Sequence, residues 1–315
     1  MQMKRVLAVS LWCLIIVACA NQQVVFTATP LPTFAEPELT TEHISGWIAY
    51  SVLVSREPFV TQIFLKNLET DETRQLTNSG NNSWARWSPD GTQIMYVSWT
   101  KENLFDIYIM DKGGGNQRPI ISTPANELVP DWSPDGRKIA YVVSDEDSIS
   151  NIYVFDLQTM KTMQITSDTL GGFAPKWSPN GSELSFVSNS SENKRDGRSQ
   201  VFIMNADGSD VRQMTPYDLD HFEDSPVWCP DSSCIIFMRF IGPPKLMFLD
   251  LASGEVTQFI PNVFDDEIME TGLARSSSRG YITFIAGETY YAMDVNTKRI
   301  YSLGVKNAYD LALYP

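Results

Sequence analysis

The chain has 315 residues, of which 43% are hydrophobic and 20% are charged, and its formal net charge at pH 7 is −14. Such an acidic chain is not expected to bind nucleic acid or to lie against anionic lipid. It holds only two histidines and four cysteines, so the composition does not favour a zinc site.

The N-terminus has the pattern of an export signal. Lys4 and Arg5 precede an apolar run, Val6–Val17, that is too short to span a bilayer. Residues 1–18 therefore read as a signal peptide. Because Cys19 follows Ala18 directly, the end of this segment resembles a bacterial lipobox, which implies a lipid on Cys19 and an anchor on the extracytoplasmic side of the cell membrane. An ordinary signal peptide with a chance cysteine is the alternative.

Residues 19–43 follow the predicted cleavage point and are rich in threonine and proline, with Pro30, Pro32 and Pro37 close together. This segment has too few apolar residues to form a core, and its composition is typical of an extended linker. We expect it to act as a tether between the lipid and a folded domain that begins at Ile44.

A pentapeptide recurs in the remaining residues. Trp-Ser-Pro-Asp-Gly begins at Trp87 and at Trp132, a copy with asparagine begins at Trp177, and a weaker copy begins at Trp228. The spacings are 45, 45 and 51 residues. A period of this length, with several strand-like segments in each unit, is typical of a β-propeller blade.

The second unit shows the expected pattern of four strands, at Glu127–Ser133, Lys138–Ser144, Asn151–Asp156 and Lys161–Thr166. Pro-Asp-Gly between the first two strands suits a tight turn, because proline fixes φ, aspartate bonds to nearby backbone and glycine accepts a positive φ. We expect the repeated tryptophan to pack between blades. The alternative is that the tryptophans line a ligand channel.

Six copies of the second strand can be counted, starting at Ile48, Ile94, Ile139, Leu184, Ile235 and Ile282. The first copy has no first strand before it, whereas Tyr309–Pro315 at the C-terminus looks like a first strand with nothing after it. Leu313 aligns there with the signature tryptophan, and Arg275 replaces it in the last unit. The sequence therefore predicts an all-β fold over residues 44–315: a six-bladed propeller closed by its C-terminal strand, which removes the exposed edges.

These motifs resemble the WD-like propeller repeat of the TolB family, over roughly residues 44–315. The resemblance implies a β-propeller that acts outside the cytoplasm. TolB itself carries an additional α/β domain before its propeller, and residues 20–43 could not encode one. We therefore expect an exported lipoprotein without that domain.

Cys229 and Cys234 lie on either side of the predicted turn in the unit that begins at Trp228. They replace Ser133 and Lys138 of the intact repeat, two positions that should face each other across a hairpin. An exported protein favours a disulfide here. Two free thiols or half of a metal site are the alternatives.

Loop lengths predict which face binds. Loops between the first and second strands and between the third and fourth strands are short, whereas the loops on the opposite face are longer and differ in every unit, for example Val52–Thr61, Asn189–Ser199 and Pro261–Gly272. We call this second face the variable-loop face. Its candidate binding residues are Trp84, Trp99, Phe105, Glu127, His221, Phe222, Glu223, Asp224, Phe240, Phe264 and Glu270. The alternative for each aromatic is that it caps the end of the blade core.

Two consecutive inter-blade loops are crowded with carboxylates. Hard oxygen ligands in irregular loops suit Ca²⁺, so the sequence suggests a cation between the fourth and fifth blades. No EF-hand spacing is present, and separately solvated carboxylates are the alternative. The candidate ligands are Asp220, Glu223, Asp224, Asp266 and Glu270.

The sequence contains no GxSxG elbow or other catalytic motif. The first hypothesis is therefore a membrane-tethered, monomeric scaffold that binds an envelope or extracellular protein, a peptide or a glycan through the variable-loop face. A hydrolase or lyase that acts on an extracellular polymer, with paired carboxylates on the same face, is the alternative from another class. A purely structural envelope protein is a third.

Overall fold

The computed structural model describes residues 38–40, 42–99, 104–144, 150–189, 198–217, 220–240, 244–259, 274–275, 280–286, 289–306 and 308–314. The chain divides into two units, Met1–Phe34 and Ala35–Pro315, and every described residue belongs to the second. Its secondary structure there is all β. In these residues the structure contains no helix with the length and apolar character that crossing a bilayer requires.

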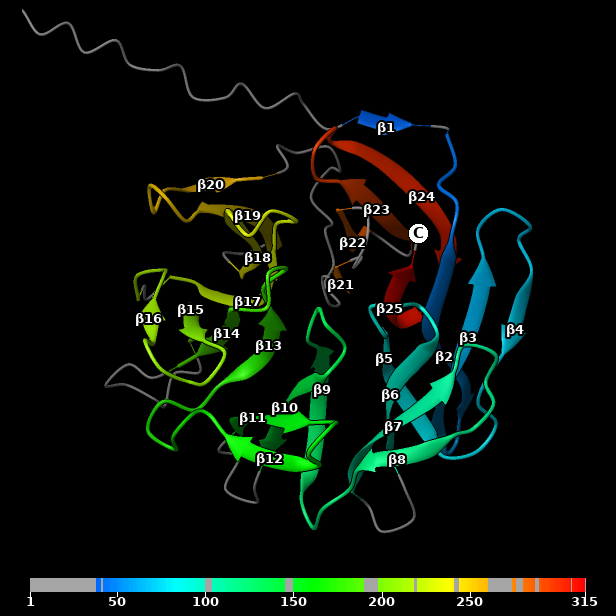
Figure 1. Ribbon diagram of the computed structural model, residues 1–315. Helices are drawn as coiled ribbons and strands as arrows, with labels where there is room; N and C mark the ends of the chain where they lie inside the picture. The colour runs from blue at the N-terminus through cyan, green and yellow to red at the C-terminus, as the bar shows by residue number, and fades with distance from the viewer. Residues whose placement is uncertain are drawn as a thin grey trace, which may run out of the picture. The chain divides into compact units, whose positions relative to one another are not determined.

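The strands of the second unit form six sheets, and the sheets are the blades of a propeller (Figure 1). Each sheet has four antiparallel strands, and one of them carries an additional fifth strand. The first strand of each blade is the innermost one, and each contacts the first strand of the next blade. Blades one to three consist of β25 (Ala308–Tyr314), β2 (Trp47–Arg56), β3 (Phe59–Asn67) and β4 (Thr73–Gln75); β5 (Asn81–Trp87), β6 (Gln93–Trp99), β7 (Phe105–Asp111) and β8 (Arg118–Ile121); and β9 (Asn126–Trp132), β10 (Lys138–Ser144), β11 (Ser150–Asp156) and β12 (Lys161–Gln164).

Blades four to six follow the same order. They consist of β13 (Phe173–Trp177), β14 (Glu183–Ser188), β15 (Gln200–Asn205) and β16 (Arg212–Gln213); β17 (Phe222–Trp228), β18 (Cys234–Phe240), β19 (Pro244–Asp250) and β20 (Val256–Gln258); and β21 (Ala274–Arg275), β22 (Tyr281–Ala286), β23 (Thr289–Asp294) and β24 (Arg299–Lys306). The predicted all-β, six-bladed fold is therefore confirmed.

The C-terminal strand closes the ring as predicted. β25 pairs with β2 in antiparallel register, with Trp47 opposite Tyr314 and Ser51 opposite Asp310. The Asp310 carboxylate accepts a hydrogen bond of 2.6 Å from Ser51 Oγ and another of 2.6 Å from the backbone N–H of Trp84 in blade two. One buried carboxylate thus joins the closing strand to two blades.

The signature pentapeptide forms the turn between the first two strands of a blade. In blade three, Ser133 Oγ donates to Asp135 Oδ1 at 2.6 Å and accepts from the backbone N–H of Lys138 at 2.8 Å. Gly136 completes the turn at φ 70°, a left-handed conformation that suits glycine. Blades two and four repeat this network around Ser88 and Ser178. The motif therefore recurs because each of its residues satisfies the same local turn.

The signature tryptophans pack in the core, which confirms that prediction. Trp87, Trp132, Trp177 and Trp228 are all buried. Two of them also hydrogen-bond to the preceding blade: Trp87 Nε1 donates to Ala312 O at 3.1 Å and Trp228 Nε1 donates to Lys176 O at 3.0 Å. The repeated aromatic thus fills space and links neighbouring blades.

In the described residues, the innermost strands of blades one to five contain a β-bulge, and in four of these blades the residue three positions before the tryptophan has a positive φ. These residues are Trp84 (52°), Val129 (48°), Ala174 (51°) and Ser225 (51°). Left-handed φ is rare for a β-branched residue such as Val129. The same bulge recurs in blades that have different residues at this position. The packing of the inner strands therefore imposes the bulge, and the conformational preference of the individual residue does not.

Two segments differ from the sequence-based expectation. Residues 19–43 are predicted as a tether without structure, but Glu38–Thr40 forms β1, which pairs in parallel with Arg299–Tyr301 of β24 as a fifth strand of blade six. Val52–Thr61 is predicted as a loop, but β2 and β3 continue through it, with only Glu57 and Pro58 between them. Both elements form because their backbone pairs with another strand. The repeat pattern does not encode this pairing.

Candidate functional site

The variable-loop face carries the exposed aromatic side chains of the propeller. Five aromatic side chains are exposed in the described part of the chain, and all five lie at strand ends on this face: Phe59, Trp99, Phe173, Phe222 and Tyr309. The opposite face, which we call the turn face, carries the signature turns and presents no exposed aromatic among the described residues. The exposed aromatic side chains of the described residues are thus concentrated on one face.

The predicted aromatic residues differ in burial: two are exposed, two are half-buried and stack on the exposed ones, and Trp84 packs against the core. Trp99 and Phe222 are exposed, and each stacks on a half-buried neighbour that was also predicted, Phe105 at 6.1 Å and Phe240 at 4.5 Å between ring centroids. Trp84 is half-buried and packs against the apolar core of blades two to five.

Phe264 lies outside the described residues, as does Glu270. Sequence reasoning missed Phe59, Phe173 and Tyr309, all of which are exposed aromatics. The signal that could have found them is their place next to the long connections, at the start of a strand rather than inside a loop.

A cavity of about 530 Å³ opens beside two of these aromatics, between blades one and two. Its lining combines aromatic rings with amide side chains, and includes Phe59, Trp99, Tyr96, Tyr108, Asn81 and Gln117. The amides are held in place: Asn81 Oδ1 accepts from the backbone N–H of Thr61 at 2.8 Å, and Gln117 Nε2 donates to Leu76 O at 2.9 Å. The cavity therefore has ordered, polar and aromatic walls without a charged side chain among the lining residues.

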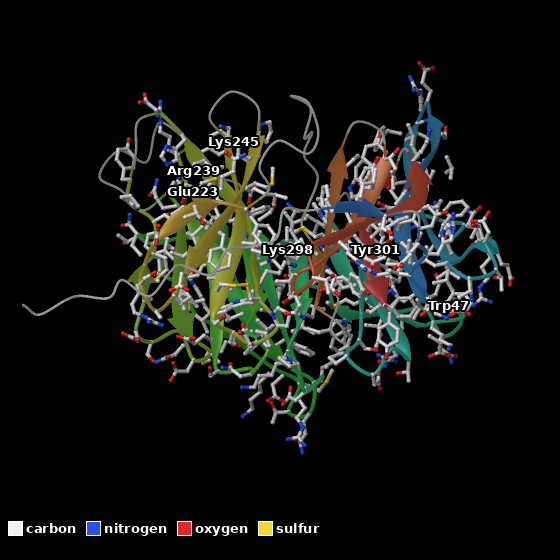
Figure 2. All side chains as sticks on the ribbon, turned by 90° about the horizontal axis from the view of Figure 1, so that it is seen from above. Trp47, Glu223, Arg239, Lys245, Lys298 and Tyr301 are labelled. Carbon is white, nitrogen blue, oxygen red and sulfur yellow. A yellow bond between two sulfur atoms is a disulfide. The ribbon has the colours of Figure 1, made fainter. Side chains whose placement is uncertain are left out.

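The predicted acidic residues are mostly engaged within the protein. Glu223 is fully buried, and its Oε1 accepts hydrogen bonds from Arg239 Nε at 3.1 Å and Nη2 at 2.6 Å. Figure 2 shows the two side chains together near one end of the propeller. Glu223 Oε2 accepts from Thr215 Oγ1 and from the backbone N–H of Val201. His221 Nε2 lies 3.6 Å from Glu223 Oε1. The Glu223 carboxylate is thus an internal anchor and does not face a ligand.

Glu127 is the equivalent residue of blade three and is also fully buried. Its Oε1 accepts from Thr123 Oγ1, whereas its Oε2 has no hydrogen-bond partner. The pKa of this carboxyl is raised to about 7, chiefly by burial; the hydrogen bond from Thr123 opposes this shift, and the nearby charge of Asp106 adds to it. Glu127 does not line the cavity between blades one and two.

The predicted calcium ligands are not brought together by the described residues. Asp220 is exposed, and Asp224 Oδ1 accepts a 2.6 Å hydrogen bond from the backbone N–H of Ser225, while burial raises the pKa of Asp224. Asp266 and Glu270 lie outside the described residues. Within the described ranges, no three histidine, cysteine or acidic side chains form a metal-binding group. The calcium site stays a prediction, and Glu223 is a poor ligand for it because Arg239 already occupies its carboxylate.

The structure describes one of the two predicted covalent sites, the disulfide, but not the lipidation site. The structure joins Cys229 and Cys234 in a disulfide across the signature turn of blade five, with Cα atoms 5.2 Å apart, a normal separation for such a bond. Cys19 lies outside the described residues.

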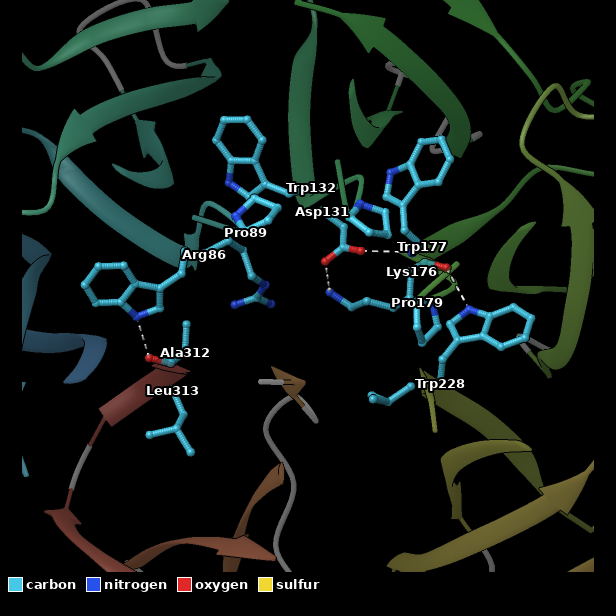
Figure 3. A pocket seen from close by; sticks show the side chains of 13 residues that line it. Arg86, Pro89, Asp131, Trp132, Lys176, Trp177, Pro179, Trp228, Ala312 and Leu313 are labelled. Carbon is cyan, nitrogen blue, oxygen red and sulfur yellow. Dashed lines mark hydrogen bonds and ion pairs between the residues drawn. The ribbon is translucent and has the colours of Figure 1, made fainter. Parts of the chain in front are cut away.

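Sequence reasoning also missed a set of charged residues on the turn face. Arg86, Asp131 and Lys176 each precede a signature tryptophan, in blades two, three and four. They line a cavity of about 130 Å³ together with the four tryptophans and three signature prolines (Figure 3). The sequence contains the information needed to find them. The repeat places the residue before each signature tryptophan at the equivalent position of every blade, so charged residues at this position in consecutive blades should lie near one another.

Comparison with known proteins decides the family. The model of the TolB β-propeller domain matches residues 92–259, more than half of the chain. The chain belongs to the TolB β-propeller family. Among curated proteins, none matches this member of the family.

Solved structures resemble this TolB-family propeller in fold. TolB from Acinetobacter baumannii superposes with a TM-score of 0.68 and 19% identity, covering 86% of this chain and 67% of that one. An oligogalacturonate lyase from Vibrio parahaemolyticus superposes with a TM-score of 0.54 and 14% identity, covering 85% of this chain and 86% of the lyase. A puromycin-hydrolysing peptidase from Mycobacterium tuberculosis superposes with a TM-score of 0.58 and 15% identity, covering 85% of this chain and 44% of the peptidase. Because TolB, a lyase and a peptidase share this architecture, the fold alone does not assign an activity.

Proposed function

We propose that this TolB-family propeller is a membrane-tethered, extracytoplasmic scaffold that binds a protein, peptide or glycan on its variable-loop face. The observation that carries the proposal is the position of the exposed aromatics: all five in the described residues lie on that face. Aromatic side chains supply much of the energy at binding surfaces, and rigid β-scaffolds usually bind through their irregular connections.

The cavity between blades one and two is the part of this face best shaped for a ligand. Trp99 is 38% exposed and Phe59 is 49% exposed, so both rings present apolar surface at its rim. Amide and hydroxyl groups line the interior and offer directional hydrogen bonds. An aromatic rim with a neutral polar interior suits an uncharged stretch of peptide or a glycan.

A paired substitution tests the binding face. Trp99→Ser removes an aromatic at the cavity rim, and Met160→Ser removes an apolar side chain on the turn face that is even more exposed. Tagged proteins are incubated with solubilised native envelope, and bound material is quantified by mass spectrometry. We expect a bound species whose recovery falls about tenfold with Trp99→Ser, since an aromatic hot spot contributes roughly 1–2 kcal/mol, and stays unchanged with Met160→Ser. Equal recovery by both variants would contradict the proposal.

The tether is tested separately through Cys19. A Cys19→Ser variant should move from the membrane pellet to the soluble fraction, because acyl chains at this cysteine provide the proposed anchor. Retention of the variant in the pellet would refute the lipid anchor and leave the binding proposal standing.

A further inference from the structure

The cavity on the turn face brings three charged side chains together in an otherwise acidic protein. Arg86, Asp131 and Lys176 come from consecutive blades and line the same space of about 130 Å³ (Figure 3). Two of the three are cationic, whereas the formal net charge of the whole chain is −14. Neither the variable-loop face nor the proposed binding function involves these residues.

The one carboxylate in this cavity is already engaged. Asp131 Oδ1 lies 3.3 Å from Lys176 Nζ, and Asp131 Oδ2 accepts a 2.9 Å hydrogen bond from the backbone N–H of Trp177. Asp131 thus balances Lys176. The second positive charge of the cavity, on Arg86, is left without this counter-charge.

Arg86 has unused hydrogen-bonding capacity. Its Nη1 donates to Ala85 O at 2.8 Å, but its Nε is buried and has no hydrogen-bond partner. The pKa of Lys176 is lowered to about 8, chiefly by burial; Asp131 opposes this shift, and the positive charge of Arg86 adds to it. Arg86 and Lys176 therefore repel each other in a space from which solvent is partly excluded. An anion between them would offset this repulsion and the free-energy cost of burying the two positive charges.

The tryptophans of the cavity add further donors. Trp132 and Trp177 are buried, and their indole Nε1 atoms have no hydrogen-bond partner, unlike those of Trp87 and Trp228. Among the described residues that line this cavity, the buried side-chain polar atoms without a partner are Arg86 Nε and these two indole nitrogens, and all three are donors. An acceptor with negative charge complements this lining.

We propose that the turn-face cavity binds a small anion with a carboxylate or phosphate group, held between Arg86 and Lys176. The volume suits a group of that size and is too small for a nucleotide or an oligosaccharide. Asp131 fixes the Lys176 ammonium in position, and the guanidinium of Arg86 offers the paired donors that match such oxyanions. The site is independent of the variable-loop face.

Thermal unfolding in different salts tests this site. The full-length protein is melted in sodium acetate and in sodium sulfate, with sodium chloride of matched ionic strength as the reference. Sulfate stands in for phosphate because its charge is constant across neutral pH. We expect a saturable rise in melting temperature of about 2–4 °C over chloride. The tryptophan fluorescence should change over the same concentration range, because four tryptophans line the cavity.

Two arginine variants separate specific binding from general salt effects. Arg86→Gln should remove the acetate and sulfate responses, and in chloride it should be at least as stable as the wild type, because it removes an uncompensated charge. Arg137→Gln is the control, since Arg137 is 73% exposed at the signature turn of blade three and should keep both responses. If the wild type and Arg86→Gln respond equally to the three salts, the cavity does not bind anions through Arg86 and the proposal fails.

Discussion

Blades three and five place a glutamate at the same backbone position, but the two carboxyls are in opposite electrostatic situations. Glu127 precedes Trp132 and Glu223 precedes Trp228 by the same five residues, and both side chains are fully buried. The difference lies across the strand pair. Arg239 faces Glu223, whereas Val143 faces Glu127.

This difference shows that the repeat determines where a side chain lies, while a single residue on the neighbouring strand determines whether its charge is tolerated. The Arg239 guanidinium donates two hydrogen bonds to Glu223 and keeps that carboxylate paired. Val143 offers Glu127 no such partner, and the pKa of Glu127 rises to about 7. The same two blades also differ at the turn face, where Gly136 and Ser133 of blade three are replaced by Ser232 and Cys229.

The largest effect is expected when the counter-charge of blade five is removed. Arg239→Leu leaves the Glu223 carboxylate buried without its cation, and breaking a buried pair in this way costs about 3–5 kcal/mol. The matched change in blade three, Val143→Leu, should cost less than about 1.5 kcal/mol because it only alters apolar packing. Urea unfolding at pH 7 measures both free energies. Similar values for the two variants would show that Arg239 does not stabilise Glu223.

The same substitution should have opposite signs at the two glutamates. A carboxyl whose pKa is higher in the folded than in the unfolded state binds its proton more tightly when folded, so its contribution to stability is lost as the pH rises from about 4.5 to about 7. At pH 8, Glu127→Gln should therefore stabilise the protein, by at most about 3 kcal/mol, and at pH 4 it should have little effect.

Glu223→Gln should destabilise the protein at pH 8, because it leaves Arg239 as the unpaired charge. Unfolding free energies of the wild type and both variants, measured between pH 4 and pH 8, provide the comparison. Destabilisation of the protein by Glu127→Gln at pH 8 would show that the Glu127 carboxylate is stabilised in the folded state.

The disulfide of blade five should contribute a smaller amount. Cys229 and Cys234 are separated by only five positions, so the bond restricts the unfolded chain little. The Cys229→Ser/Cys234→Ser variant should lose about 1–3 kcal/mol, while Ser133→Ala in blade three should lose about 1 kcal/mol from the turn hydrogen bonds. Mass spectrometry of the non-reduced protein provides the direct check. Two freely alkylated thiols would refute the bond.

The smallest effect concerns the turn residue itself. Ser232 has φ 62° where Gly136 has φ 70°, so blade five holds a side chain in a conformation that glycine adopts more easily. Ser232→Gly should stabilise the protein by about 0.5 kcal/mol, and Gly136→Ser should destabilise it by about 1 kcal/mol. Differential scanning fluorimetry can compare the two. A loss of stability in Ser232→Gly would mean that other contacts of Ser232 outweigh the backbone strain.

The sequence predicts the blades well because their determinants are local. The hydrogen bonds of the signature serine link residues two and five positions apart, so the motif itself specifies the turn and the two strands beside it. Ring closure is also predictable, because Leu313 occupies the signature position without a following hairpin and pairs with Ile48. These features follow from a short stretch of sequence.

The remaining features depend on residues that are far apart in the chain. β1 pairs with β24 across more than 250 residues, and three residues carry too little pattern to predict it. The ionisation of Glu127 depends on Val143, an apolar residue, lying opposite it on β10, and the charge of the turn-face cavity depends on three blades at once. Of the predicted binding residues, Trp99 and Phe222 are exposed on the variable-loop face, whereas the half-buried Trp84 packs against the core.

Site-specific photo-crosslinking tests most directly whether ligands bind at the variable-loop face. A photoreactive phenylalanine analogue replaces Phe59, Trp99 or Phe222 on that face, and Met160 or Arg137 on the turn face; all five side chains are exposed. After irradiation in native envelopes, the three variable-loop positions should give a shared crosslinked product that the two turn-face positions do not form. Crosslinked products confined to positions 160 and 137 would contradict the proposal and would place the binding surface on the opposite face.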